Sequence, residues 1–337
     1  MRAFIINKPY ESVIGDWEKP TPAAGEVLVE VRAAGICAGD MYAYTGKNPY
    51  AVYPAICGHE IAGTIAEVGA EVSGLETGMP VVVEPFIGCG TCYPCRVGKS
   101  NCCARLTIIG VHIPGGYAEF VKAPARLVHL APPGLSFTWA AFAEPVAIGV
   151  QACRRGEVGA EDVLILGCGP IGLACIEVAR TRGARVIAAD VEPGRLATAQ
   201  AFGAETLPAD ERLRDGVLER TSGEGFPVVI EATGNPQAME ATVDLVAAGG
   251  RIVILGLVKQ GVRISFPGLD FTRKEMTIVG SRASVNCFPE ALQLMASGSI
   301  TYPKIATEFS LWDAPHVFAD LAAHPSRAQK GVLVLDR

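Results

Sequence analysis

Four cysteines lie close together between residues 89 and 103, in the spacing C-x2-C-x2-C-x7-C: Cys89, Cys92, Cys95 and Cys103. Four thiolates on a loop that also carries Gly and Pro can surround one tetrahedral Zn²⁺, at Zn–S distances of about 2.3 Å. A shell closed by four sulfurs leaves no position for a substrate. We therefore expect a structural zinc here.

Two other uses of these cysteines are weaker hypotheses. Disulfides require an oxidising compartment, and four-thiolate iron–sulfur clusters usually have other spacings that often end in Cys-Pro. One ambiguity stays within the zinc hypothesis, because Cys102 directly precedes Cys103. The x7 spacing favours Cys103 as the fourth ligand.

A glycine-rich turn, Gly-Cys-Gly-Pro-Ile-Gly, begins at Gly167. It follows a short apolar strand and opens a helical segment, which is the context typical of dinucleotide binding. Gly167 permits the tight turn, Gly169 lets the backbone approach a pyrophosphate, and Gly172 lets the helix pack on the strand. Pro170 and Ile171 complete the helix N-terminus, whose free N–H groups attract phosphates.

An acidic residue, Asp190, ends the next predicted strand, eighteen residues after Gly172. Its carboxylate can bind both ribose hydroxyls and would repel a 2′-phosphate, so we predict NAD rather than NADP. Arg195, five residues further on, either flanks the adenosine ribose or is a solvated surface arginine.

Three scattered residues could form a second metal site: Cys37, His59 and Glu144. Cysteine, histidine and glutamate from separate loops can hold one Zn²⁺ while the fourth position stays open for water or an alcohol. Spacing alone does not assemble them, since a lone histidine or cysteine more often serves the core.

Length and composition limit the function classes. A chain of 337 residues suggests two domains, and a net charge of −6 without a basic run argues against nucleic-acid binding. No apolar stretch approaches 18 residues, and the N-terminus lacks a secretion signal, so neither a membrane nor an exported location is expected. Eleven cysteines then favour metal binding in the cytoplasm.

The first 150 residues show short strands punctuated by Gly and Pro, as in an irregular barrel, whereas strands alternate with helices from about residue 161. That alternation predicts an α/β fold with a Rossmann doubly wound parallel sheet. A helix and a strand from Lys330 end the chain and return to the first domain. We predict a catalytic domain, residues 1–147 plus 289–337, interrupted by an NAD-binding domain, residues 148–288. The predicted strands span residues 27–33, 61–68, 79–85, 162–167, 184–190, 227–232, 251–256 and 276–280.

Over nearly its whole length the sequence resembles the zinc-dependent medium-chain alcohol dehydrogenases, in the branch of polyol, threonine and sugar-acid dehydrogenases. Within that branch, residues 48–54, 110–112 and 281–289 look most like the hexonate 5-dehydrogenases of L-galactonate or L-gulonate type. The motifs that carry the resemblance are Gly35-Ile-Cys-Ala-Gly-Asp, Gly58-His-Glu, the four cysteines, Ala143-Glu-Pro, Gly167-Cys-Gly-Pro-Ile-Gly and Glu231-Ala-Thr-Gly.

The resemblance implies that the β-rich part is a GroES-like catalytic domain in which Cys37, His59 and Glu144 bind a catalytic zinc. Glu60 matches a residue beside the metal that can replace its water ligand, and Asp40 matches a carboxylate that orients the zinc-binding histidine. It further implies two zinc ions per chain, hydride exchange between NAD and a secondary alcohol of a polyol or sugar acid, and a ketone product. A homodimer or homotetramer formed through sheet edges is also implied.

Substrate contacts are the least determined part of the site. Arg282 and Asn286 match the region that contacts further hydroxyls in polyol dehydrogenases, and Tyr50 belongs to the same candidate pocket. Arg282 would suit a carboxylate, although an ion pair with a surface acid or contact with the cofactor stays open. Lys330 is a candidate contact for the pyrophosphate.

One departure from the family pattern concerns proton release. The family usually has a Ser or Thr and a His where this chain has Gly39 and Tyr42. Glycine has no hydroxyl, and tyrosine is a poorer proton carrier than imidazole near neutral pH. Water, Glu60 or Tyr42 must then carry the proton. Two other hypotheses remain: a threonine-type dehydrogenase, which would be expected to keep the relay, and a non-catalytic NAD-binding homologue.

Overall fold

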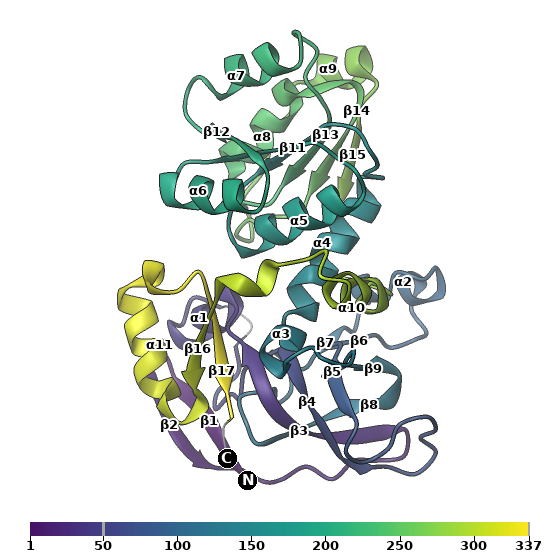
Figure 1. The fold of residues 1–337 in the computed structure, drawn as a ribbon, viewed down its shortest axis with the longest axis vertical. Helices are drawn as coiled ribbons and strands as arrows, with labels where there is room; N and C mark the ends of the chain where they lie inside the picture. The colour runs from purple at the N-terminus through teal and green to yellow at the C-terminus, as the bar shows by residue number, and fades with distance from the viewer. Residues whose placement is uncertain (49–50, 336–337) are drawn as a thin grey trace. The chain divides into compact units, whose positions relative to one another are not determined.

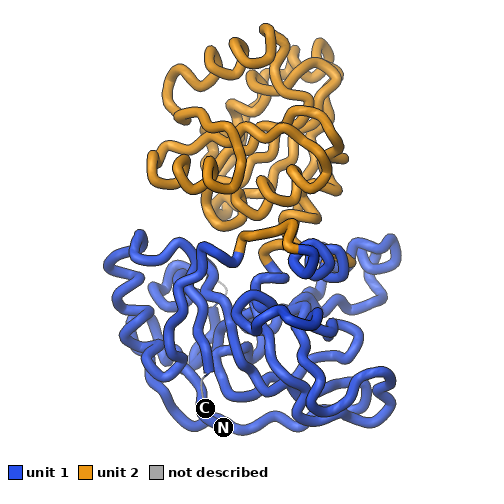
Figure 2. Tube along the Cα trace, in the orientation of Figure 1, with its two compact units in different colours: residues 1–144, 288–297, 303–337 blue, residues 145–287, 298–302 orange. Residues whose placement is uncertain are grey.

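The computed structural model describes residues 1–48 and 51–335. Two compact units account for the chain (Figure 2). Unit 1 comprises Met1–Glu144, Phe288–Ser297 and Pro303–Arg337, and unit 2 comprises Pro145–Cys287 and Gly298–Tyr302. The sequence placed the domain boundaries after residues 147 and 288, and the assignment of catalysis to one unit and of NAD binding to the other stays a prediction.

Unit 1 is built on a seven-stranded sheet of order β16-β17-β3-β4-β5-β9, with β8 also pairing with β3 (Figure 1). Strand β17 pairs antiparallel with β3, so the C-terminal segment closes onto the N-terminal sheet. The strands of this unit are β1 (Arg2–Lys8), β2 (Glu11–Asp16), β3 (Glu26–Gly35), β4 (Glu60–Val68), β5 (Pro80–Val83), β6 (Phe86–Ile87), β7 (Thr107–Ile108), β8 (Phe120–Pro124), β9 (Val128–Leu130), β16 (Ala306–Ser310) and β17 (Lys330–Val334).

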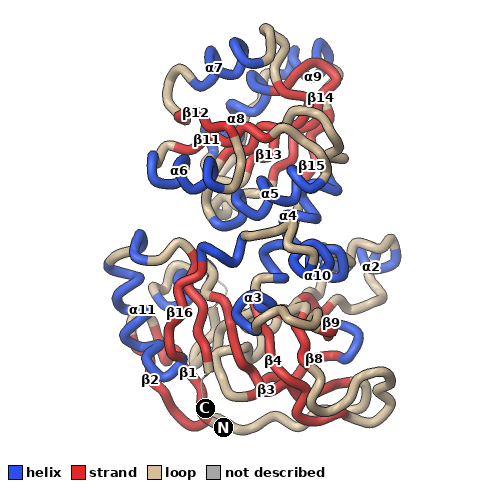
Figure 3. Tube along the Cα trace, in the orientation of Figure 1, coloured by secondary structure: helices blue, strands red, loops and turns tan. Residues whose placement is uncertain are grey.

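The helices of unit 1 are short. They are α1 (Ala38–Tyr44), α2 (Tyr93–Arg96), α3 (Phe137–Ala141), α10 (Phe288–Ala296) and α11 (Ala314–Ala323), while α4 (Ala143–Arg155) begins in unit 1 and continues into unit 2. The sequence predicted one helix in the C-terminal segment, and the structure contains two, α10 and α11. Strands and helices alternate along unit 1 less regularly than along unit 2 (Figure 3).

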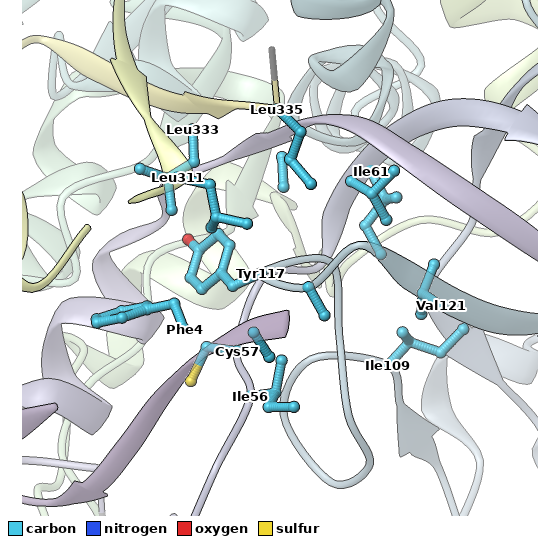
Figure 4. Close-up of a cluster of buried hydrophobic side chains, with 14 of the residues drawn as sticks. Phe4, Ile56, Cys57, Ile61, Ile109, Tyr117, Val121, Leu311, Leu333 and Leu335 are labelled. Atoms are coloured by element: carbon cyan, nitrogen blue, oxygen red, sulfur yellow. The ribbon is translucent and has the colours of Figure 1, made fainter. Parts of the chain in front are cut away.

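The core of unit 1 surrounds a fully buried tyrosine, Tyr117 (Figure 4). Its ring centroid lies 6.1 Å from that of Phe4 and 5.7 Å from that of Phe318. Leu333 of β17 belongs to the same cluster. Each Å² of buried apolar area contributes about 25 cal/mol to the free energy of folding. Packing of this cluster therefore stabilises the segments around Tyr117 that carry the metal-site residues.

Unit 2 contains a six-stranded parallel sheet of order β12-β11-β10-β13-β14-β15. This doubly wound order confirms the predicted fold class. Its strands are β10 (Val163–Leu166), β11 (Val186–Asp190), β12 (Glu205–Pro208), β13 (Phe226–Glu231), β14 (Val246–Ile254) and β15 (Thr277–Gly280). Its helices are α5 (Pro170–Thr181), α6 (Pro193–Ala201), α7 (Leu213–Arg220), α8 (Pro236–Leu245) and α9 (Gly268–Lys274). Among the described residues, no helix combines the length and the apolar character needed to cross a membrane.

Candidate metal centres and nucleotide site

The four cysteines of the predicted structural site converge in the structure. Cys89, Cys92, Cys95 and Cys103 each offer a sulfur, and the four sulfurs lie within 4.8 Å of one another. Helix α2 and the short turn Ser100–Cys102 fold the loop back on itself and bring Cys103 to the other three. Cys103 is buried, whereas Cys102 is exposed. The geometry therefore selects Cys103, as the spacing predicted.

Backbone N–H groups donate hydrogen bonds to a sulfur of this group. The N–H groups of Cys89 and Arg105 both donate to Cys103 Sγ, at 3.2 Å. The backbone N–H of Thr91, followed by its hydroxyl and by the Arg105 guanidinium, lowers the pKa of Cys89 to about 4. A thiolate held at neutral pH is the form that binds a metal. The donor set fits Zn²⁺.

The second candidate metal site forms where β3, α1 and β4 meet. Cys37 directly precedes α1, His59 directly precedes β4, and one ligand atom from each lies within 4.8 Å of the other and of a carboxylate oxygen of Glu60. Sulfur, imidazole and carboxylate suit Zn²⁺. The structure thus brings together Cys37 and His59, as predicted, with Glu60 as the carboxylate in this group.

Asp40 is the buried carboxylate that organises this site. Its Oδ2 accepts hydrogen bonds from the Cys37 N–H and the Tyr117 hydroxyl, both at 2.8 Å, and its Oδ1 lies 3.7 Å from His59 Nδ1. Burial alone would raise the pKa of Asp40, but the nearby charge of His59 and the hydrogen bonds from Cys37 and Tyr117 lower it. An ionised Asp40 therefore orients His59.

Glu60 forms a buried ion pair with a lysine. Lys330 Nζ pairs with Glu60 Oε1 and donates to the Ile36 carbonyl at 3.0 Å, and both side chains are buried. The other carboxylate oxygen, Glu60 Oε2, is buried without a hydrogen-bond partner. A Cβ on Gly35 would collide with that oxygen. A buried oxygen without a partner, on a residue of the candidate metal group, fits an ion there.

Lys330 has a different place from the one that the sequence suggested. We considered it a contact for the pyrophosphate, yet its ammonium is buried in unit 1 and bound to Glu60. Sequence reasoning missed this pair because 270 residues separate the partners, and only the pairing of β17 with β3 brings them together.

Glu144, predicted as the third zinc ligand, lies in the first turn of α4 and is buried. It is not part of the group formed by Cys37, His59 and Glu60. Burial, opposed by the charge of His59 and reinforced by that of Glu60, raises the pKa of Glu144 to about 7. Glu144 is therefore a buried carboxylate whose negative charge is only partly offset by its neighbours. A cation bound nearby would stabilise its ionised form.

Tyr117 is the site residue that sequence reasoning missed. Its hydroxyl supports Asp40 and also lies 3.0 Å from the Gly35 carbonyl. Gly58 has φ +92°, and a Cβ there would meet the Tyr117 ring at 2.6 Å. The two glycines before Tyr117 were a signal of local backbone constraint, but nothing in their spacing indicated a link to Asp40.

Gly39 and Tyr42, which stand where the family usually has the proton relay, have room around them in the structure. A Cβ on Gly39 would meet only Cys37 Sγ, at 4.0 Å. Tyr42 follows on the same helix, with 53% of its surface exposed. Neither residue fills a space in the core.

The glycine-rich turn takes the predicted form between β10 and α5. Gly167 has φ +96°, and a Cβ on Gly172 would collide with the Gly167 carbonyl. Gly169 directly precedes α5, and a Cβ there would meet nothing within 4 Å, which leaves its backbone open to a ligand. Pro170 and Ile171 form the first turn of α5.

Asp190 ends β11 beside that turn and is buried. Its Oδ2 accepts from the Cys168 N–H at 2.8 Å, its Oδ1 accepts from the Glu192 N–H at 2.9 Å, and Arg195 Nη1 lies 3.8 Å from Oδ2. Asp190 therefore shapes the turn as well as presenting a carboxylate at the carboxyl edge of the sheet.

The candidate substrate contacts of the sequence analysis lie in unit 2 and in a segment that the structure does not describe. Arg282 and Asn286 are exposed residues of the segment after β15. Asn286 has φ +53°, a conformation that asparagine tolerates better than most residues, and its carbonyl accepts from Arg154 at 2.8 Å. The positive φ at this position therefore explains why an asparagine stands there. Tyr50 lies outside the described residues.

Known proteins match both parts of the chain. Residues 23–133 match the alcohol dehydrogenase GroES-like domain, and residues 170–297 match the zinc-binding dehydrogenase family. The L-galactonate-5-dehydrogenase of Escherichia coli K12 is 37% identical over 317 residues, 91% of each chain. The L-threonine 3-dehydrogenase of Pyrococcus horikoshii is 34% identical over 91% of this chain and 90% of that relative.

Solved structures agree over the full length. A short chain alcohol dehydrogenase (rspB) from E. coli CFT073, complexed with NADH, superposes with a TM-score of 0.92 at 31% identity and covers 99% of both chains. The alcohol dehydrogenase TADH from Thermus sp. ATN1 superposes with a TM-score of 0.92 at 29% identity over 100% of both chains. With the two family matches, the metal-binding groups and the glycine-rich turn, this chain belongs to the zinc-binding alcohol dehydrogenases with a GroES-like domain.

Proposed function

We propose that this protein is a zinc- and NAD-dependent dehydrogenase that oxidises a secondary alcohol of a polyol or sugar acid to a ketone. One observation carries the proposal. Cys37, His59 and Glu60 offer sulfur, nitrogen and oxygen within 4.8 Å of one another, and Glu60 carries a buried carboxylate oxygen that has no hydrogen-bond partner. Such a donor set suits a metal that keeps one position open for substrate.

We propose that Cys37, His59 and Glu144 would hold the zinc, with Glu60 as a further carboxylate beside it. A Zn²⁺ held there would supply a Lewis acid able to lower the pKa of an alcohol hydroxyl from about 16 towards 7, and NAD would supply the hydride acceptor. Because Nδ1 of His59 faces Asp40, Nε2 would be the ring nitrogen available to the metal. Lys330 holds one oxygen of Glu60, and the other stays available to a cation.

NAD binding is assigned to unit 2. The open backbone at Gly169 and the N-terminus of α5 suit the pyrophosphate. Asp190 presents the carboxylate that favours a free 2′-hydroxyl over a 2′-phosphate. The change Asp190→Ala should raise the ratio of NADP to NAD in kcat/KM. Asp190 also supports the turn, so its loss can lower the rate with both cofactors, and the ratio of the two kcat/KM values is the measurement that decides. An unchanged ratio would contradict the ribose role.

The substrate class rests on the relatives and on Arg282. The names of the relatives include L-galactonate-5-dehydrogenase, sorbitol dehydrogenase and L-threonine 3-dehydrogenase. The threonine-type hypothesis is weaker here because Gly39 and Tyr42 replace the usual relay. A guanidinium at Arg282 suits a substrate carboxylate, which favours a sugar acid over an uncharged polyol.

A substrate screen tests the function. NAD⁺ reduction should be followed with hexonates, hexitols, pentitols and threonine, for the native protein and for Cys37→Ala. We expect turnover with a hexonate or hexitol in the native protein alone. Turnover with threonine alone would support the amino-alcohol alternative. Zinc-loaded protein without activity on any alcohol would support the non-catalytic homologue and contradict the proposal.

Location and assembly complete the proposal. We infer a cytoplasmic enzyme, since its cysteines suit metal binding and thiols persist in that compartment. We infer a homodimer or homotetramer, because β15 is an edge strand of the unit 2 sheet and can pair with a second copy. A monomeric mass from light scattering would contradict the assembly.

A further inference from the structure

The four-cysteine group brings more negative charge than one divalent metal neutralises. Four thiolates carry four negative charges, and Zn²⁺ offsets two of them. The residues Cys89, Cys92 and Cys95 are only partly buried. The site therefore needs donors from outside the ring of sulfurs, and such neighbouring groups strongly affect metal affinity in proteins.

Arg105 reaches the sulfurs through its backbone, through Thr91, and by the direct attraction of its guanidinium for Cys89. Its backbone N–H donates directly to Cys103 Sγ at 3.2 Å. Its guanidinium Nη2 donates to Thr91 Oγ1 at 2.8 Å, and Thr91 Oγ1 lies 3.6 Å from Cys89 Sγ. Because the threonine oxygen accepts from a cation, its own hydrogen is free to point at the sulfur. A hydrogen-bonded chain then runs from Arg105 through Thr91 to Cys89.

A second arginine contacts the same threonine in a different way. Arg96 Nη1 donates to the backbone carbonyl of Thr91 at 2.6 Å. This bond braces the loop, but it cannot pass polarisation to the hydroxyl or to a sulfur. Arg96 and Arg105 are both exposed cations next to Thr91, so the pair offers an internal control for charge and for loop stiffness.

We propose that Arg105 and Thr91 are positioning residues of the four-sulfur zinc site, which compensate its excess negative charge and slow the loss of the metal. Arg105 supplies the positive charge, and the Thr91 hydroxyl directs it to Cys89. This inference rests on the zinc binding in the proposed function and is independent of the substrate, because the closed site takes no part in turnover.

Zinc release tests the proposal without an activity assay. The protein should carry Cys37→Ala, so that the four-cysteine site is the zinc site that remains, and it should be purified with zinc and mixed with a chromogenic chelator. We expect Arg105→Gln and Thr91→Val to release zinc roughly 10-fold faster than the parent, in line with other outer-layer changes. Thr91→Ser keeps the hydroxyl and should release zinc at the parent rate, as should Arg96→Gln.

Each contrary result overturns the proposal. If Thr91→Val releases zinc at the parent rate, the Thr91 hydroxyl has no role in holding the metal. If Thr91→Ser and Thr91→Val both release zinc equally fast, the effect comes from the shape of the side chain and not from its hydroxyl. Acceleration by Arg96→Gln equal to that by Arg105→Gln would show that loop stiffness or unspecific positive charge, rather than the contact of Arg105 with the Thr91 hydroxyl, causes the effect. A parent protein without zinc would remove its basis. Both arginines and Thr91 are exposed, so the substitutions leave the core of unit 1 intact, which circular dichroism would verify.

Discussion

At the scale of single residues, the metal site depends on partners that stabilise buried charge. Glu60 is paired with Lys330, and Asp40 accepts hydrogen bonds from the Cys37 N–H, the Gly58 N–H and the Tyr117 hydroxyl. Such arrangements are costly to break, because a charge left alone in the interior keeps its desolvation penalty. Two predictions follow from the carboxylates of this site.

Replacing Lys330 with methionine should strongly destabilise the protein. Glu60 would then keep a buried charge without its cation, and breaking a buried pair in this way costs about 3–5 kcal/mol. Urea unfolding of the zinc-loaded protein measures the effect. The double change Lys330→Met with Glu60→Gln is the control and should recover part of the loss. A free energy of unfolding within about 1 kcal/mol of the native value for Lys330→Met alone would show that the pair contributes little.

Stabilisation by zinc should grow as the pH rises through 7. The pKa of Glu144 is raised to about 7 from an ordinary 4.5, so without metal the folded state binds more protons than the unfolded state between these values. Its contribution to stability therefore falls as the pH rises through that window. Bound zinc offsets the ionised carboxylate. The difference in Tm between zinc-loaded and chelated protein should be larger at pH 8 than at pH 6, and Glu144→Gln should flatten this trend. An equal difference at both pH values in the native protein would contradict the coupling.

At the scale of elements, the sequence predicted most of unit 2 and the loops with local motifs. Strand β10, the turn at Gly167 and helix α5 follow from neighbouring residues alone, because apolar runs and glycines act locally. The buried pair of Lys330 with Glu60 and the bond from Tyr117 to Asp40 link residues 270 and 77 positions apart. Sheet pairing and core packing create those contacts, and local patterns do not encode them.

Helix α1 offers a place to restore the missing proton relay. A side chain at Gly39 would meet only Cys37 Sγ, at 4.0 Å, and Tyr42 is exposed. The double change Gly39→Ser with Tyr42→His should fold normally and raise kcat at neutral pH by roughly 10-fold, below the 10²–10⁴ of a mature acid–base group. The pH dependence of kcat should gain a step near 6.5, the ordinary pKa of histidine.

Tyr42→Phe is the control for the present route of the proton. Unchanged kcat in that variant would exclude the tyrosine hydroxyl as the carrier. If the double variant has the same kcat and the same pH profile as the native enzyme, proton release through α1 does not limit the rate, and our account of the departure is wrong.

At the scale of the whole molecule, the candidate metal-binding residues and the glycine-rich turn belong to two separately packed units. The metal-binding residues of unit 1 surround Tyr117, and the glycine-rich turn of unit 2 is supported by Asp190 and the parallel sheet. Within the described residues, the contacts that shape the turn come from unit 2 itself. Cofactor binding should therefore tolerate loss of the metal.

Removal of zinc with a strong chelator should abolish alcohol oxidation while NADH binding persists. Turnover needs the Lewis acid, whereas the affinity for the dinucleotide comes largely from phosphate and ribose contacts at the turn. Titration of NADH fluorescence should give a Kd within about threefold of the native value, a difference below 1 kcal/mol. Cys37→Ala should behave in the same way, and Gly172→Val, which would collide with the Gly167 carbonyl, should lose NADH binding. Loss of NADH binding on chelation would show that metal and cofactor are held by one cooperative site rather than by two.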